Sequence, residues 1–131
     1  MKRILLLLLL CSTTLLMAQQ TDPIQEAMAS YDYETALSLI AQKKPATPLL
    51  LQKGKALRSL GLNAEALSTY QEIIGKDSTN TRALIEAAEC CRTLAKYKQA
   101  SAYYEKVLDL TPENKYVRIQ LSLIHISEPT R

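Results

Sequence analysis

Hydrophobic residues recur at helical spacing through the middle of this chain. After a break at residues 60–63, the apolar side chains of Ala66, Tyr70, Ile73 and Ile74 are spaced i, i+4, i+7 and i+8, which places them on one face of a helix. The segment before the break has apolar residues at a similar spacing. The pattern therefore predicts two short antiparallel helices joined by a tight turn.

This pattern returns after 34 residues. The shift pairs Leu50 with Leu84, Gly54 with Ala88, Ala66 with Ala100, Tyr70 with Tyr104 and Ile73 with Val107. Residues 47–80 and 81–114 are thus predicted to be two copies of one unit. A single helix pair cannot cover its own apolar faces, so we expect successive pairs to stack into a superhelix.

The expected helix ends follow from turn and cap residues. Thr47 followed by Pro48 predicts a cap and a proline at the first helical position, where no backbone donor is lost. Gly61 can take the left-handed conformation that ends a helix, and Asn63 is predicted to cap the next one.

Small residues at matched positions are predicted to let the helices approach closely, with tyrosines filling the space between pairs. The expected packing residues are Gly54, Ala66, Tyr70, Ala88, Ala100, Tyr104 and, beyond the second helix of its unit, Pro112.

The period, these positions and the string from Lys96 to Asn114 resemble the tetratricopeptide repeat. The resemblance implies an all-α fold, a right-handed α–α superhelix. It continues more weakly on both sides: residues 19–46 are similar to a degenerate partial repeat with an irregular link, and residues 115–120 to the opening of a further repeat. One departure is Lys53, which stands where the family usually has leucine.

The family resemblance implies protein–protein interaction through a concave groove lined by the first helix of each pair. By this analogy a partner protein or peptide would meet Leu51, Lys55, Arg58, Arg82, Ile85, Glu89 and Arg92. The basic members of this set favour an acidic peptide; the alternative is that they are solvated charges without a partner. The asparagines with which chaperone-binding members hold a terminal carboxylate have no match here.

The first eighteen residues have the layout of a secretory signal peptide. Lys2 and Arg3 precede an apolar stretch that ends at Ala18, and this stretch is shorter than the ~20 residues of a membrane-spanning helix. We therefore predict cleavage after Ala18 and export to the periplasm or cell envelope, with membrane contact only through this leader. An uncleaved anchor and lipidation of Cys11 remain the alternatives.

Residues 121–131 match, without a mismatch, the in-frame translation of a transposase adapter used in short-read sequencing libraries. We interpret this segment as a non-native tail, so that the solenoid is truncated after Gln120; the alternative is a natural tail. On this interpretation the visible repeats are either a scaffold or the docking module of a larger enzyme or sensor whose catalytic domain lies further downstream.

Composition argues against an enzyme or a nucleic-acid partner in residues 19–120. The chain has 131 residues, a net charge of +3 and one histidine, His125, which lies in the suspected tail. The mature segment has thirteen basic and twelve acidic residues, too balanced for nucleic-acid binding. Histidine-based catalytic or metal sites and a glycine-rich phosphate loop are absent from it, so we expect no cofactor.

Two remaining features allow a plain and a sharper interpretation. Cys91 matches Leu57, which favours a buried thiol, whereas Cys90 could form an intermolecular disulfide. Tyrosines at helical spacing favour packing between repeats over a ring-stacking platform for nucleic acid or sugar. These tyrosines are Tyr97, Tyr103, Tyr104 and Tyr116.

Overall fold

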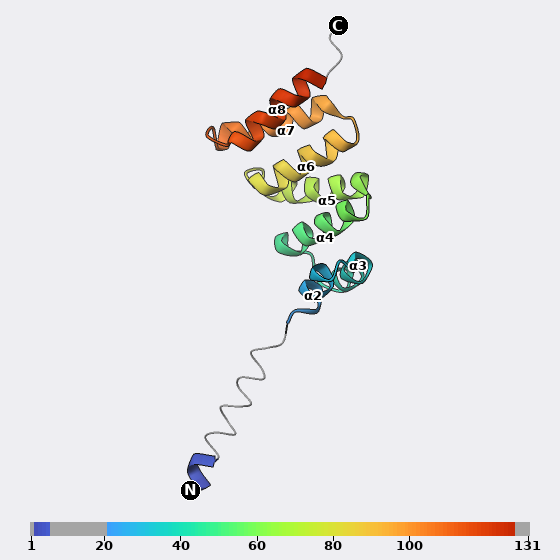
Figure 1. Ribbon diagram of the computed structural model, residues 1–131, viewed down its shortest axis with the longest axis vertical. Coiled ribbons are helices and arrows are strands. Elements are labelled where there is room, and N and C mark those ends of the chain that lie inside the picture. The colour runs from blue at the N-terminus through green and yellow to red at the C-terminus, as the bar shows by residue number, and fades with distance from the viewer. Residues whose placement is uncertain (1, 6–20, 128–131) are drawn as a thin grey trace.

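The computed structural model describes residues 2–5 and 21–127, so the predicted cleavage site after Ala18 lies outside the described residues. Residues 21–127 form seven α-helices, and no strand occurs in the described ranges (Figure 1). The helices are α2 (Pro23–Ala29), α3 (Tyr33–Ala41), α4 (Thr47–Ser59), α5 (Asn63–Lys76), α6 (Thr81–Thr93), α7 (Tyr97–Leu110) and α8 (Lys115–Ser127).

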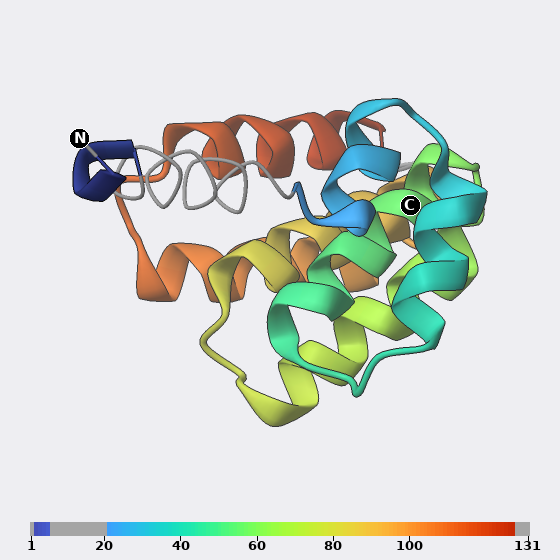
Figure 2. The same cartoon turned by 90° about the horizontal axis from the view of Figure 1, so that it is seen from below.

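Each helix packs mainly on its neighbours in the chain, from α2 against α3 through to α7 against α8. The helices therefore rise in chain order along one axis, and successive pairs turn about it when the stack is seen from below (Figure 2). Contacts restricted to neighbours are the signature of a solenoid. The predicted all-α superhelical stack is confirmed.

The turn within each pair contains one residue in the left-handed conformation. Gly61 has φ +77°, as predicted, and the matching positions of the other two turns hold Tyr31 (φ +62°) and Ala95 (φ +58°). In each case the left-handed residue follows the first helix and reverses the chain into the second.

The two predicted caps are wrong by one position. α4 begins at Thr47 after an extended Ala46 that caps it, so Pro48 falls within the first turn, where its missing N–H still costs no hydrogen bond. Asn63 is likewise the first residue of α5 instead of its cap, because its side chain turns back and donates to the Gly61 carbonyl over 3.3 Å.

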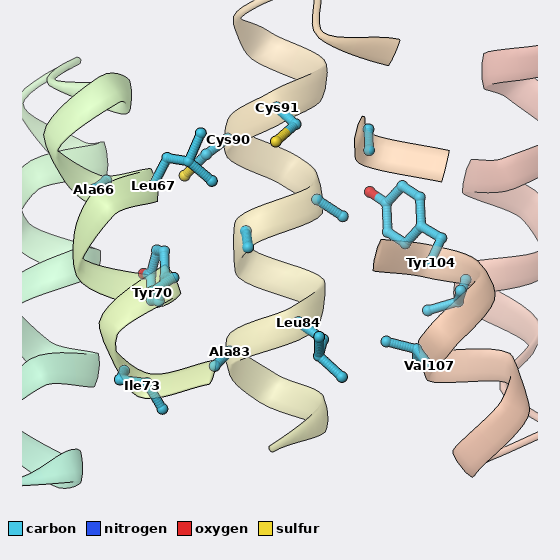
Figure 3. Close-up of a cluster of buried hydrophobic side chains, with 14 of the residues drawn as sticks. Ala66, Leu67, Tyr70, Ile73, Ala83, Leu84, Cys90, Cys91, Tyr104 and Val107 are labelled. Atoms are coloured by element: carbon cyan, nitrogen blue, oxygen red, sulfur yellow. The ribbon is translucent and has the colours of Figure 1, made fainter. Parts of the chain in front are cut away.

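The hydrophobic core is centred on α6, which lies between α5 and α7 (Figure 3). Cys90 of α6 lies beside Leu67 of α5, and Tyr104 of α7 lies on the opposite side of α6. Of the predicted packing residues, all but one are buried, and Pro112 lies exposed in the turn after α7. The buried ones are Gly54, Ala66, Tyr70, Ala88, Ala100 and Tyr104.

The first pair is built differently from the others. α3 has nine residues, whereas α5 and α7 have fourteen each. With Ala36 aligned on Ala66, Ile40 takes the place of Tyr70, and Lys43 in the link after α3 takes the place of Ile73. The first pair therefore lacks both the buried tyrosine and the last apolar turn of the second helix that the full repeats have.

The last helix continues past Gln120 into the segment that matches the adapter. α8 runs to Ser127, and Val117, Leu121 and Ile124 share one face, with Ile124 buried. The apolar spacing of these residues is enough to produce a helix whatever their origin. The non-native origin of residues 121–131 stays a prediction, and residues 128–131 lie outside the described ranges.

Candidate functional site

The first helices of successive pairs line a surface cavity of about 540 Å³. Met28 of α2, Leu51 and Lys55 of α4 and Arg82 of α6 are among its walls. Its location follows from the stacking, because each second helix packs between two first helices and leaves one face of the first helices uncovered. This end of the site combines apolar side chains with two cations.

A second cavity of about 500 Å³ adjoins the first and shares Lys55 and Arg82 with it. Arg58 of α4 and Glu86 of α6 complete its charged lining. We call the two cavities together the α2–α4–α6 groove. It runs from an apolar end at Met28 to a basic end at Arg58.

The basic end holds three cations and one carboxylate. Arg58 donates from its Nη1 to Oε2 of Glu86, and both side chains keep about 30% of their surface exposed, 31% and 29%. Burial opposes the charge of Arg58, but Glu86 outweighs this effect and raises the pKa of the guanidinium. Lys55 and Arg82 form no ion pair with any described residue, so two positive charges face the groove uncompensated.

Four of the seven residues predicted for a partner groove line the cavities: Leu51, Lys55, Arg58 and Arg82. The other three lie elsewhere on α6. Ile85 packs half-buried against the core, Glu89 is buried, and Arg92 pairs with Glu89.

Glu89 is the centre of a buried polar cluster that joins α6, α7 and α8. Its Oε1 accepts hydrogen bonds from the hydroxyls of Tyr104 and Tyr116, the latter over 2.7 Å, and its Oε2 accepts from Arg92 over 2.8 Å. Burial by itself raises the pKa of the carboxyl, but these hydrogen bonds outweigh it and lower the pKa below the ordinary value. Glu89 therefore links three helices as a carboxylate and does not face the groove.

Among the groove residues that sequence reasoning missed, Glu86 and Met28 matter most for the charge and the apolar surface of the site. Glu86 follows Arg82 by one helical turn, so the spacing alone could have placed it on the same face. Met28 belongs to α2, a helix that the sequence analysis did not single out within residues 19–46.

Cys90, Cys91 and most of the tyrosines singled out in the sequence pack in or against the hydrophobic core. Cys91 is fully buried, as predicted, and Cys90 is buried too, so neither offers a surface thiol for an intermolecular disulfide. Burial raises the pKa of Cys90 to about 11, which leaves little thiolate at neutral pH. Tyr97 and Tyr103 pack half-buried against the core and Tyr104 is buried within it, as the packing interpretation predicts. Tyr116 is the exception: 49% of its surface is exposed, and its hydroxyl donates to Glu89.

The described part of the chain holds neither a cluster of metal-ligand side chains nor a membrane-spanning helix. Within residues 2–5 and 21–127, no three His, Cys, Asp or Glu side chains gather closely enough to hold a metal ion. Among the helices of this same part of the chain, none has the length and apolar character needed to cross a membrane.

Comparison with known proteins places residues 81–114 in the Tetratricopeptide repeat family. No curated protein sequence matches the chain significantly. Among solved structures, the first TPR of Spaghetti (RPAP3), bound to the HSP90 peptide SRMEEVD, is 22% identical with a TM-score of 0.72, over 79% of this chain and 86% of that chain.

Two bacterial structures are similar to the same degree. A tetratricopeptide repeat protein from Parabacteroides merdae is 24% identical with a TM-score of 0.73, over 79% of this chain and 43% of that chain. The Yersinia enterocolitica type III secretion chaperone SycD, in complex with a peptide of the translocator YopD, is 17% identical with a TM-score of 0.73, over 81% of this chain and 89% of that chain.

Proposed function

Because residues 81–114 are a tetratricopeptide repeat and the whole stack has the fold of such domains, we propose that this protein is an interaction scaffold that binds a partner peptide in the α2–α4–α6 groove. Two structures of the same fold carry bound peptides, the HSP90 peptide on Spaghetti and the YopD peptide on SycD. In this proposal the protein recruits a partner and does no chemistry on it.

The observation that carries the proposal is the pairing of an apolar end with a basic end in one groove. Met28 and Leu51 offer contact surface to apolar side chains, whereas Lys55, Arg58 and Arg82 attract carboxylates. The complementary ligand is an extended segment with apolar residues at one end and acidic residues at the other.

We further propose that the protein acts in the cell envelope after export. The support is the leader sequence alone, with its basic start, short apolar stretch and small residue at Ala18. Expression in a Gram-negative host, followed by fractionation and N-terminal sequencing, tests this. A periplasmic product that begins at Gln19 is expected, and a cytoplasmic product that retains Met1 would contradict export.

Peptide binding is tested with a fluorescein-labelled octapeptide that contains two leucines followed by three glutamates. The control peptide has the same sequence with glutamines in place of the glutamates. Fluorescence anisotropy with the full chain should give saturable binding of the acidic peptide, weakened by added salt, and weaker binding of the glutamine peptide.

The matched variants separate the groove from general surface charge. Lys55→Gln with Arg82→Gln removes the two unpaired cations of the groove, and exposed charge pairs are worth ~0.5–1 kcal/mol each, so binding should weaken about fivefold to thirtyfold. Lys98→Gln with Lys106→Gln removes two exposed lysines of α7 that do not line the groove. If the two double variants weaken peptide binding equally, the assignment of the binding site to the groove is wrong.

A further inference from the structure

The short α3 leaves a third cavity, of about 460 Å³, between α3 and α4. Leu37 and Ile40 of α3 form one wall, and Leu49 and Leu50 of α4 form the other. The cavity shares no lining residue with the α2–α4–α6 groove, so it is a separate site.

Comparison of the repeats within the chain explains why this space is open. In the full repeats the last turn of the second helix places Ile73 or Val107 in the core, both fully buried. α3 ends at Ala41, so the matching position, Lys43, lies in the link and supplies no apolar side chain. The cavity also lacks an aromatic ring, because Ile40 stands at the position that Tyr70 occupies one pair later.

Two lysines line this otherwise largely apolar cavity. Lys53 is half-buried on α4, at the position that matches the fully buried Ala87 of the next repeat, and Lys43 comes from the link after α3. Neither forms an ion pair with any residue that the structure describes. A lysine can lay its aliphatic stem on an apolar wall while its ammonium group stays available to an anion.

We propose that the α3–α4 cavity binds an aliphatic carboxylate, a single hydrocarbon chain with one anionic head. The chain would take the place of the missing helical turn between Ile40 and Leu50, and the carboxylate would sit between the ammonium groups of Lys43 and Lys53. The volume lies within the ~300–1,000 Å³ of small-molecule pockets, and apolar walls with few polar groups are their usual lining.

Calorimetric titration of the full chain with decanoate, far below the concentration at which it forms micelles, tests this proposal. Saturable binding of one decanoate per chain is expected, with decanol, which lacks the charge, binding at least fivefold more weakly. The absence of saturable decanoate binding, or equal binding of decanol, would overturn the proposal.

Three variants locate the ligand. Ile40 lines the cavity, so the larger side chain of Ile40→Tyr should take up part of its volume and abolish binding. Lys53→Gln should weaken binding at least fivefold without adding volume, and this variant decides the matter if Ile40→Tyr does not fold. Lys106→Gln, on the exposed surface of α7, is the matched control and should bind as the unaltered chain does.

The other candidate occupant is a second copy of this chain, and sedimentation velocity detects it. A monomer with and without decanoate is expected. A dimer that Ile40→Tyr converts to a monomer would show that the cavity is a subunit contact, and the ligand proposal would then be wrong. None of these results depends on whether a peptide binds the α2–α4–α6 groove.

Discussion

The ring of Tyr70 lies directly against the backbone of Gly54. A methyl group on residue 54 would come within 2.6 Å of Cε1 of Tyr70 and 2.8 Å of its hydroxyl oxygen, well inside van der Waals contact. Tyr70 is only 1% exposed, so its ring has little room to move away. This contact limits how closely α4 and α5 pack, whereas the second repeat has Ala88, which carries one methyl group more, at the position that matches Gly54.

Overpacking of Gly54→Ala against Tyr70 should cost about 1–3 kcal/mol, and the higher helix propensity of alanine within α4 offsets up to about 1 kcal/mol of this, so we expect a net loss of stability of up to about 2 kcal/mol. Thermal and urea unfolding of the full chain measure the change. Gly75→Ala is the matched control, because no atom lies within 4 Å of a methyl group there and α5 gains helix propensity. If the two variants are equally stable, the contact does not limit the packing of α4 on α5.

A second prediction concerns the left-handed turn residue between α6 and α7. Ala95 has φ +58°, a conformation that costs an L-residue about 1–2 kcal/mol and glycine very little. The greater chain entropy of unfolded glycine removes part of this gain, so Ala95→Gly should stabilise the fold by about 0.5–1 kcal/mol. A lower midpoint in urea for Ala95→Gly would contradict this assignment.

The matching substitution in the preceding turn provides the reciprocal test. Gly61→Ala places an alanine at φ +77°, so it should lower stability although nothing lies within 4 Å of the added methyl group. If Gly61→Ala lowers the stability of the fold and Ala95→Gly raises it, backbone strain and not side-chain packing determines the effect at these two positions.

These turns also illustrate what the sequence could predict. Gly61 identified one turn because glycine is the usual left-handed residue. The left-handed residue of the next turn, Ala95, lies 34 residues later, but alanine gives no such signal by itself. The apolar spacing of α5 and α7 likewise predicted the stack, since a one-sided helix must be covered by another. Local polar residues were less informative: Thr47 and Asn63 lie one position inside their helices, because a cap depends on backbone geometry as much as on residue type.

The candidate site was predictable only in part. Lys55, Arg58 and Arg82 could be assigned to one face from helical spacing and the family resemblance. The role of Glu89 could not, because its neighbours Tyr104 and Tyr116 come from two other helices. A glutamate on a helix is usually exposed to solvent, so the sequence alone gives no indication that Glu89 is buried.

Protonation of Glu89 should lower the free energy of unfolding of this protein at acidic pH. Burial opposes the charge, but hydrogen bonds from Tyr104, Arg92 and Tyr116 hold the pKa in the folded state below the ordinary value of 4.5. A lowered folded pKa contributes stability that is fully present above the unfolded pKa and is lost as the pH falls through the folded pKa. The contribution should thus be complete at pH 7 and decline below about pH 4.5.

Glu89→Gln tests this link by urea unfolding at pH 7 and at pH 3. At pH 7 we expect a loss of about 1–3 kcal/mol, because the buried hydroxyl of Tyr104, the hydroxyl of Tyr116 and Arg92 lose a charged acceptor. At pH 3 the difference from the unaltered chain should shrink. Glu72→Gln, which removes an exposed pair with Lys76, should cost less than about 1 kcal/mol at pH 7. A difference for Glu89→Gln that is the same at both pH values would show that its charge does not stabilise the α6–α7–α8 junction.

The central claim, that the α2–α4–α6 groove binds a peptide with apolar and acidic residues, is tested most directly by amide NMR of the full chain titrated with the leucine–glutamate octapeptide. The largest shifts are expected at residues that line the groove, above all Leu51, Lys55 and Arg82, and they should saturate together with one affinity. Shifts confined to the outer surfaces of α5 and α7, or the absence of any saturable shift, would contradict the claim.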